Sequence, residues 1–213
     1  MSQRRPAISN SAGENRDTAS KLPRPGMPRR SAANRKRPPV SDEPVLGLLW
    51  GEVHLAEHDP HWTSLYEQER DCLLKALGPA ALDIQHVGST AVPRLTAKPI
   101  IDIAVAITHL TQAKDAEPAL RDLDYEFMPD IKIPGELFYR KLTGTHHLHI
   151  LEFGSDHWQN YIRFRDYLRE NPHVASDYIE LKRALADRFS HDRPSYTRGK
   201  AQFIESILRK ARE

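Results

Sequence analysis

The sequence predicts an α/β (α+β) fold with a mixed sheet flanked by helices, a helical C-terminal third and a disordered basic tail at the N-terminus. Three observations lead to this prediction. The composition changes near residue 45, short β-branched segments alternate with helical periodicity between residues 59 and 153, and the apolar spacing after Ser155 is helical. We therefore expect residues 1–44 to be a tail and residues 45–213 to form one domain.

The tail is distinguished by its proline content and its charge. Its first forty residues contain six prolines and no aromatic residue, so they cannot bury enough apolar surface to offset the entropy of ordering. They hold ten Lys or Arg against two acidic residues, a net charge of +8, so the rest of the +2 chain carries −6. Such basic clusters could contact nucleic acid, anionic lipid or an acidic partner, and the alternative is a solvated, dispensable extension.

Several kinds of protein are excluded by what the sequence lacks. It has no run of eighteen apolar residues that could span a membrane and no apolar secretory signal, so we expect a cytoplasmic protein with no membrane partner. Cys72 is the only cysteine, which excludes an internal disulfide and a cysteine cluster for zinc. Its place in a helical apolar stripe predicts a small core residue.

The first half of the domain is predicted to begin with a helix and to continue into strands. Asp59 and Pro60 fit an N-cap and a first helical position, and Gly78 with Pro79 ends the helix. Residues 82–87 and 100–107 then have strand character, and the second segment is rich enough in β-branched residues to be buried on both faces.

The second half is predicted to complete the sheet and then to become helical. Its apolar spacing changes from strand to helical periodicity after Ser155, and Asn171-Pro172 interrupts the helical part. The predicted elements are a helix over 111–123, strands over 125–128, 137–142 and 147–153, a hairpin turn at 143–145, helices on either side of Asn171-Pro172, and a last helix capped by Ser195.

The segment with the strongest chemical character joins the first two strands. A strand ending in Gly88-Ser89-Thr90 leaves backbone N–H groups and hydroxyls free at a turn, where they can hold an anion such as a triphosphate. Asp102 then emerges on the neighbouring strand, and a carboxylate beside phosphate oxygens suits magnesium. The alternative is an ordinary turn beside a surface aspartate.

Two histidines add a second set of candidate residues. His147 and His149 lie two apart on a predicted strand and therefore face the same side. With Asp102 they form a candidate catalytic and metal-binding set of two imidazoles and one carboxylate, which suits zinc, manganese or iron better than magnesium. The histidines could equally bind phosphate or act as a general acid and base. The alternative is that they hydrogen-bond water or backbone.

Four basic residues are further candidates for binding a nucleotide. Lys98 precedes the strand that carries Asp102, so it could reach a phosphate as a point charge, or it could be solvated. Arg140 lies on the hairpin strand facing the histidines and could bind a triphosphate or a carboxylate, or form a surface ion pair. Lys182 and Lys200 on the terminal helices could close over a ligand, or serve solubility.

The strongest resemblance to a known family is carried by residues 86–103, which read HVGSTAVPRLTAKPIIDI. This phrase resembles the defining signature of the GrpB family almost letter for letter. The resemblance covers about residues 53–211. It also includes Asp59, Trp62 and Glu69 in the first helix, HHLHI at 146–150, FRDYLR at 164–169, and Tyr178, Lys182, Tyr196 and Lys200.

This resemblance implies a fold and an activity. The GrpB family is placed in the nucleotidyltransferase-fold superfamily, whose members pair a Gly-Ser turn with an acid-x-acid strand and a third acid on a later strand. The resemblance therefore implies a nucleotide-binding, nucleotidyltransferase-like enzyme that acts on a small-molecule or protein acceptor. Its implied cofactors are a nucleoside triphosphate, first of all ATP, and magnesium or manganese, with zinc as an alternative.

One departure from the superfamily pattern leaves the activity open. Ala104 occupies the place of the second acid, so an obvious ligand of the two-metal clamp is missing. Either one metal suffices, another side chain substitutes, or nucleotidyl transfer has been lost. The resemblance also implies an alternative, a non-catalytic accessory or folding-assistance module with a protein partner, as in fusions with dephospho-CoA kinase. Nucleic-acid binding through the tail ranks last, because the tail lacks aromatic platforms and a reading helix.

Overall fold

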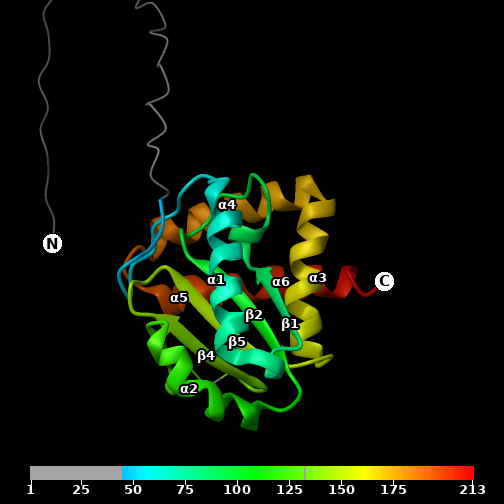
Figure 1. The fold of residues 1–213 in the computed structure, drawn as a ribbon. Helices are drawn as coiled ribbons and strands as arrows, with labels where there is room; N and C mark the ends of the chain where they lie inside the picture. The colour runs from blue at the N-terminus through cyan, green and yellow to red at the C-terminus, as the bar shows by residue number, and fades with distance from the viewer. Residues whose placement is uncertain (1–44, 132) are drawn as a thin grey trace, which may run out of the picture. The chain divides into compact units, whose positions relative to one another are not determined.

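Five strands form a mixed sheet at the centre of the described chain, and helices cover both faces (Figure 1). The structure is a computed structural model that describes residues 45–131 and 133–213, so the predicted tail lies outside the described residues. The strands are β1 (Asp83–Val87), β2 (Ile101–Ile107), β3 (Tyr125–Phe127), β4 (Glu136–Lys141) and β5 (His146–Glu152). The α-helices are α1 (His61–Leu77), α2 (Ala113–Asp122), α3 (Asp156–Glu170), α4 (Pro172–Arg188), α5 (Arg193–Gly199) and α6 (Ala201–Lys210).

The order of the strands brings distant parts of the sequence together. The sheet runs β1-β2-β5-β4-β3, with β2 and β5 parallel and the other neighbours antiparallel. In this register Asp102 lies opposite His147 on β5, and Ala104 lies opposite His149. Arg140 on β4 lies opposite His147 from the other side. The sheet itself therefore sets the predicted acid beside the predicted histidines.

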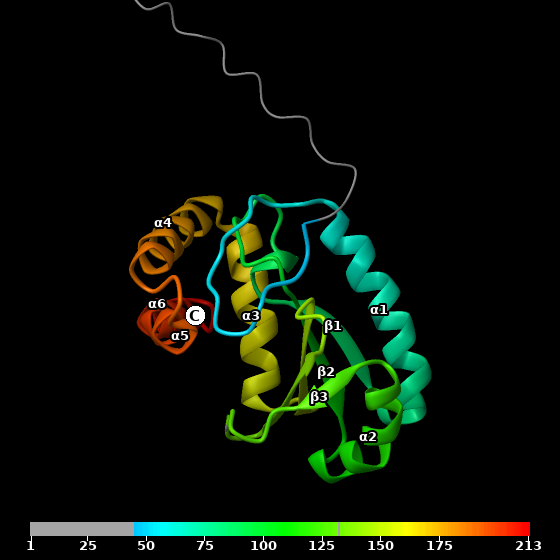
Figure 2. The same cartoon turned by 90° about the vertical axis from the view of Figure 1, so that its left-hand side faces the viewer.

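The two faces of β2 are buried against different helices, as its apolar sequence predicts. Alternate side chains of a strand point to opposite faces. Ile101 and Ile103 pack against α1 and α2, whereas Ala104 and Ala106 pack beneath Trp158 of α3. Figure 2 shows the sheet between α3 and the pair α1 and α2. Because Ala104 is fully buried under α3, the position that lacks an acid serves packing.

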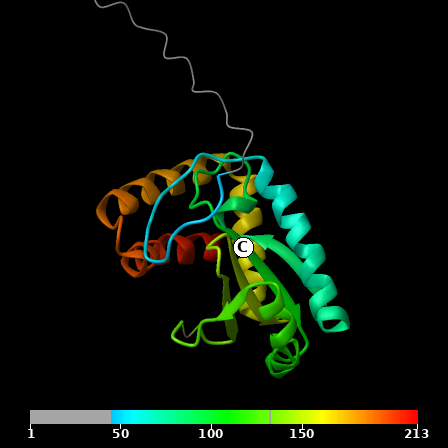
Figure 3. The same ribbon diagram turned by 60° about the vertical axis from the view of Figure 1, so that its left-hand side comes forward.

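The helical C-terminal third covers the loop that follows β1. In Figure 3 the orange and red helices α4 to α6 lie on the opposite side of the molecule from α1. Val92 and Leu95 of the loop pack against Tyr178 of α4 and Ile207 of α6, and also against Leu168 of α3. Burial of several such side chains, at about 1.5–3 kcal/mol each, holds the loop in place. The Gly88-Ser89 turn is thereby fixed between the sheet and the terminal helices.

The structure confirms the predicted order of helices and strands and corrects two details. The last helix is wrong as predicted, because two helices occupy that region and Ser195 lies inside the first of them. Asp192 is the cap, since its side chain accepts the Ser195 backbone N–H at 3.0 Å. Cys72 is exposed, so the prediction of a core cysteine is also wrong. The buried stripe of α1 runs through Glu69 and Leu73 and leaves Cys72 on the outer face.

The part of the chain that the structure describes contains no helix long and apolar enough to cross a membrane.

Candidate functional site

The candidate site is built around Asp102 at the start of β2. Val87, the last residue of β1, pairs with Asp102, so the chain reaches Gly88 directly beside the carboxylate. Gly88 has a φ of +68°, and a Cβ at this position would collide with the Asp102 side chain. Glycine therefore permits both the turn and the close approach.

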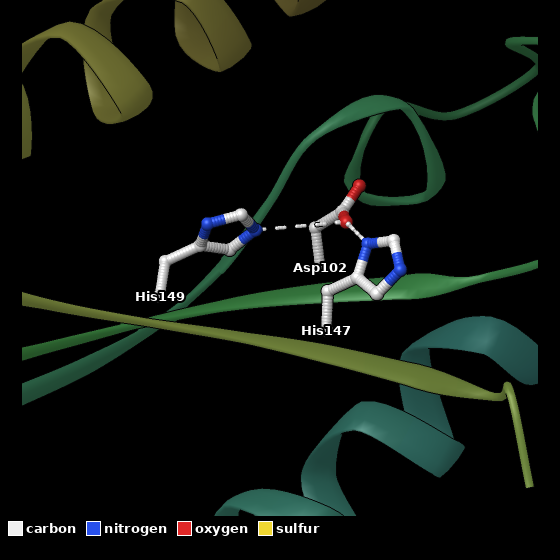
Figure 4. Close-up of side chains that lie close together, drawn as sticks. All are labelled: Asp102, His147 and His149. Atoms are coloured by element: carbon white, nitrogen blue, oxygen red, sulfur yellow. Dashed lines mark hydrogen bonds and ion pairs between the residues drawn. The ribbon is translucent and has the colours of Figure 1, made fainter. Parts of the chain in front are cut away.

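His147 connects Asp102 to an arginine that lies far away in the sequence. Its Nδ1 lies 2.9 Å from Asp102 Oδ1 (Figure 4), and its Nε2 lies 3.0 Å from Arg193 Nη2. Arginine can only donate, so His147 Nε2 accepts and its Nδ1–H donates to the carboxylate. Burial lowers the pKa of His147 to about 4, despite the hydrogen bond that the ring donates to Asp102. The ring is therefore neutral and both of its nitrogens are engaged.

His149 lies between two carboxylates. Its Nδ1 is 2.6 Å from Glu136 Oε1, and its Nε2 points toward Asp102 Oδ1 at 3.7 Å. Burial opposes a charge on this ring, but Glu136 and Asp102 outweigh it and raise the pKa of His149 to about 9. The Nε2 atom is buried and has no hydrogen-bond partner within the described structure. It is thus available to bind something placed beside Asp102.

Glu136 is a functional candidate that the sequence reasoning missed. Its side chain is fully buried, and its second oxygen receives the Tyr161 hydroxyl at 3.1 Å and lies 3.2 Å from His157 Nε2. A buried carboxylate with this many donors orients His149. No periodicity signalled Glu136, because it is the first residue of β4 and stands alone among apolar neighbours.

The donor set at this site fits a divalent metal. Asp102, His147 and His149 each offer a ligand atom, and these atoms lie within 4.8 Å of one another. Two imidazoles and one carboxylate suit zinc, manganese or iron, and the Glu136–His149 hydrogen bond resembles the carboxylate–histidine pairs that support metal ligands. The orphaned His149 Nε2 agrees with this fit. The lone pair of His147 faces Arg193, so this ring must leave Arg193 before it could ligate.

Four basic side chains lie near this carboxylate, and we call Lys98, Lys182, Arg193 and Lys200 the cation cluster. Lys98, Arg193 and Lys200 interact electrostatically with Asp102, whereas Lys182 interacts with Lys98 and Lys200. Lys182 is 1% exposed, donates to the Thr96 carbonyl and lies 3.3 Å from Ser89 Oγ. Lys98 and Lys200 both lie over the Tyr196 ring, at 5.6 and 4.8 Å. The β2 strand, α4 and the α5–α6 junction thus direct their cations to one place.

The ionisation of the cation cluster reflects its burial and crowding. Burial and repulsion from Lys200 lower the pKa of Lys182 to about 7. Burial and Arg193 lower the pKa of Lys200 to about 8, although Asp102 opposes this. Burial, Arg193 and Lys200 hold the pKa of Lys98 well below its usual range. Glu136 is already committed to His149, so Asp102 faces the cluster as a lone acid, and an added anion would be stabilised there.

Comparison with known proteins then identifies the chain. The family model described as GrpB protein matches residues 52–210, most of the domain. The chain belongs to the GrpB family. It is 39% identical over 174 residues to the glutamate-rich protein GrpB of Alkalihalophilus pseudofirmus, covering 77% of this chain and 98% of that protein. A crystal structure of GrpB from Enterococcus faecalis is 34% identical, has a TM-score of 0.69, and covers 74% of this chain and 96% of that one.

A more distant relative is an enzyme of which GrpB forms only a part. The dephospho-CoA kinase of Mycolicibacterium paratuberculosis is 26% identical over 186 residues, which cover 75% of this chain and 46% of the kinase. The fold class predicted for this GrpB chain, a mixed sheet flanked by helices with a helical C-terminal third, is confirmed.

The structure brings most of the predicted site residues of this GrpB protein together, but not all of them. Asp102, His147, His149, Lys98 and the turn at Gly88 form one contiguous site with Ser89, Lys182 and Lys200. Thr90 is buried, and its hydroxyl already bonds His86 Nε2 at 3.0 Å and the Ile100 carbonyl at 3.4 Å. Its hydroxyl therefore shapes the turn.

Arg140 forms a surface ion pair, which was the alternative to ligand binding that the sequence left open. It forms an ion pair with Glu126 at 3.0 Å, and its guanidinium lies over the Trp50 ring at 4.7 Å. It therefore lies at the rim of the site. Arg193 takes the inner position instead, and the sequence reasoning missed it. Pro194 is a local signal for the start of α5, but it says nothing about the Arg193 side chain.

Proposed function

We propose that this GrpB domain binds a nucleoside triphosphate, first of all ATP, with a divalent metal, and transfers a nucleotidyl group to a small-molecule or protein acceptor. The observation that carries the proposal is the cation cluster at the Gly88-Ser89 turn. Lys98, Arg193 and Lys200 interact electrostatically with Asp102, and Lys182 Nζ lies 3.3 Å from Ser89 Oγ. In such a transfer an acceptor oxygen attacks the α-phosphorus and pyrophosphate leaves. Charge develops on phosphate oxygens, and fixed cations stabilise it.

The residues of the chain divide the work of binding. Lys98, Lys182 and Lys200 offer charge to phosphate oxygens, and the Ser89 hydroxyl and the N–H groups of the turn donate hydrogen bonds. A bound anion also restores protons to the buried lysines, because it replaces mutual repulsion with attraction. The bound ligand would therefore reduce the electrostatic repulsion among the basic side chains of the free protein.

Asp102 and His149 are the residues that would hold a metal, with His147 as a third ligand once it leaves Arg193. A divalent metal supplies Lewis-acid stabilisation of phosphate charge when bound. Glu136 accepts the hydrogen bond from Nδ1–H of His149, so a metal would be held by Nε2. Because the pKa of this ring is raised to about 9, Nε2 must first give up its proton. In the free protein His147 bridges Arg193 and Asp102, because it accepts a hydrogen bond from the guanidinium and donates one to the carboxylate.

Calorimetry with ATP, GTP, CTP and UTP, each with magnesium or manganese, tests the binding step. We expect metal-dependent binding that Asp102→Ala abolishes and that Lys182→Met weakens by at least about tenfold, since each removes a buried charged contact. Lys75→Met is the matched control, because Lys75 is exposed near the end of α1. Absence of binding to every nucleotide under every metal condition would sink the proposal. Transfer is then followed as pyrophosphate release with candidate acceptors.

One observation favours a second function, that of an accessory module. Ala104 takes the place of an acid, and GrpB-like sequence forms part of a dephospho-CoA kinase. Under this alternative the domain binds no nucleotide, and instead it raises the refolding yield of a joined or partner protein. The same calorimetry separates the two functions.

A further inference from the structure

A small cavity adjoins the candidate site. Its volume is about 120 Å³. Sites for whole ligands usually measure 300–1,000 Å³, so this cavity fits one ring of a ligand. We call it the Trp50 cavity. Its lining includes Leu48, Trp50, Arg140, Gly144, His147 and Arg193.

The wall that carries Trp50 is fixed by backbone contacts. Gly47 N–H donates to the Pro99 carbonyl at 2.7 Å, and Leu48 N–H donates to the Gly144 carbonyl at 3.3 Å. A Cβ on Gly144 would collide with the Leu48 carbonyl, and Gly47 has a φ of +100°. The segment before Trp50 is therefore held against the β4–β5 turn and the start of β2 at positions that require glycine.

Trp50 is placed to be stacked upon. Its side chain is about half exposed, at 52%, whereas the other two tryptophans, Trp62 and Trp158, are buried. The guanidinium groups of Arg140 and Arg193 lie 4.7 and 5.2 Å from its ring centre. Both guanidinium groups already lie over the indole, so a planar ring of a ligand would stack on Trp50 by taking the place of one of them.

The cavity and the candidate site share two residues. His147 and Arg193 line the cavity, and His147 also bonds Asp102 at 2.9 Å. A ligand whose ring occupies the cavity therefore has its remainder directed to Asp102 and the cation cluster. A planar group at one end and a polyphosphate at the other is the chemistry of a nucleotide.

We propose that the Trp50 cavity binds the base of the nucleoside triphosphate. This inference rests on the proposed function. The base stacks on Trp50, and Arg140 and Arg193 offer donors to its ring nitrogens or carbonyl oxygens. Stacking is tolerant of base identity because every base has a π-face, so purine and pyrimidine nucleotides differ only modestly in affinity.

The test compares ATP with inorganic tripolyphosphate, which has the same chain of phosphates and no base, on the full chain with manganese. Wild type should bind ATP about tenfold or more tightly than tripolyphosphate, the scale of one base–aromatic stack. Trp50→Ala should bring this ratio close to one and leave tripolyphosphate affinity unchanged. Trp50→Phe should restore most of the ratio. Leu82→Ala, at another exposed apolar side chain, should leave the ratio as in wild type.

The outcomes separate the two proposals. If tripolyphosphate binds and the ratio is the same in Trp50→Ala as in wild type, the base site is wrong and the phosphate site stands. If neither ATP nor tripolyphosphate binds to wild type, both proposals are overturned. A melting curve for Trp50→Ala equal to that of Trp50→Phe excludes unfolding as the cause of any change.

Discussion

Two adjacent histidines of β5 belong to two different buried polar clusters, which lie on opposite faces of the sheet. His147 faces Asp102 and the cation cluster, whereas His146 faces α1 and what we call the Glu69 cluster, which consists of Glu69, Tyr125, Lys141 and His146. Burial lowers the pKa of both His146 and His147 to about 4. A perturbed pKa alone therefore does not tell a binding site from a structural cluster.

Charge balance does distinguish the two clusters. In the Glu69 cluster one carboxylate meets one ammonium, since Lys141 Nζ lies 2.6 Å from Glu69 Oε2, and the pair ties α1 to β4. In the other cluster Asp102 lies near several basic side chains. The Glu69–Lys141 pair is balanced in charge, although Glu69 Oε1, the Tyr125 hydroxyl and His146 Nε2 have no hydrogen-bond partner among the described residues. An excess of basic groups, in contrast, stabilises a ligand of opposite charge. The following predictions test this difference.

The largest effect is expected for Gly88→Ala. The new methyl group would collide with the Asp102 carboxylate and would also require a left-handed backbone. We expect tripolyphosphate affinity to fall by about a hundredfold or more, because the turn and the acid must separate. Gly154→Ala is the matched control, since Gly154 has a φ of +75° and open space around it. Equal losses of affinity in both variants, measured by calorimetry, would mean that backbone strain alone is responsible.

The next largest effect is expected on metal affinity, which should fall when a histidine is replaced on the Asp102 face of the sheet and not on the Glu69 face. His149→Gln removes the orphaned Nε2 atom, so we expect the affinity for zinc or manganese to fall by about 10- to 100-fold. His146→Gln removes a buried imidazole of the Glu69 cluster and should leave metal affinity unchanged. Calorimetry and elemental analysis of both purified variants give the comparison. Loss of metal from His146→Gln as well would contradict it.

Replacing one lysine on each face should produce opposite patterns. Lys182→Met should weaken tripolyphosphate binding by at least about tenfold and preserve stability, because an apolar chain fits a buried place that disfavours charge. Lys141→Met should leave binding unchanged and lower stability by about 2 kcal/mol, because Glu69 loses its buried partner. Denaturant unfolding and calorimetry on both proteins measure this. The idea fails if Lys182→Met destabilises more than Lys141→Met.

The smallest expected effect is on pH dependence. The pKa of Lys182 is lowered to about 7 in the folded protein from an ordinary value of 10.5, so the unfolded chain holds more protons between these values. This lysine therefore makes stability rise with pH across that window. Anion binding favours its charged form, so tripolyphosphate affinity should be several-fold higher at pH 6.5 than at pH 9. A profile equally steep in Lys182→Met would exclude this lysine as the cause.

The sequence predicted the scaffold of the site better than its contents. Strand alternation correctly set His147 and His149 on one side, and the β-branched run correctly placed Asp102 on a buried strand. These are local properties with a period of two. Glu136 and Trp50 escaped notice because their roles depend on neighbours in space, such as His149 and Arg193.

Helical periodicity likewise predicted the helices correctly, but it did not predict which residues of α1 face the core. Cys72 shares the apolar character of its neighbours but lies outside the buried stripe of α1. Glu69 takes a buried position instead, because Lys141 arrives from β4 to pair with it. Such a partner comes from 72 residues away and leaves no mark in the local pattern. Long-range pairing decided the details that local spacing could not.

The positions of Lys182, Arg193 and Lys200 near the end of the chain have a consequence for biosynthesis. A nascent polypeptide that has emerged from the ribosome only as far as residue 180 already holds the Gly88 turn, Asp102 and both histidines. It has only Lys98 from the cation cluster. Under the proposed function, the polyphosphate site is therefore completed after translation of the sheet, when α4 to α6 dock. Until then the site around Asp102 lacks three of the four members of the cation cluster.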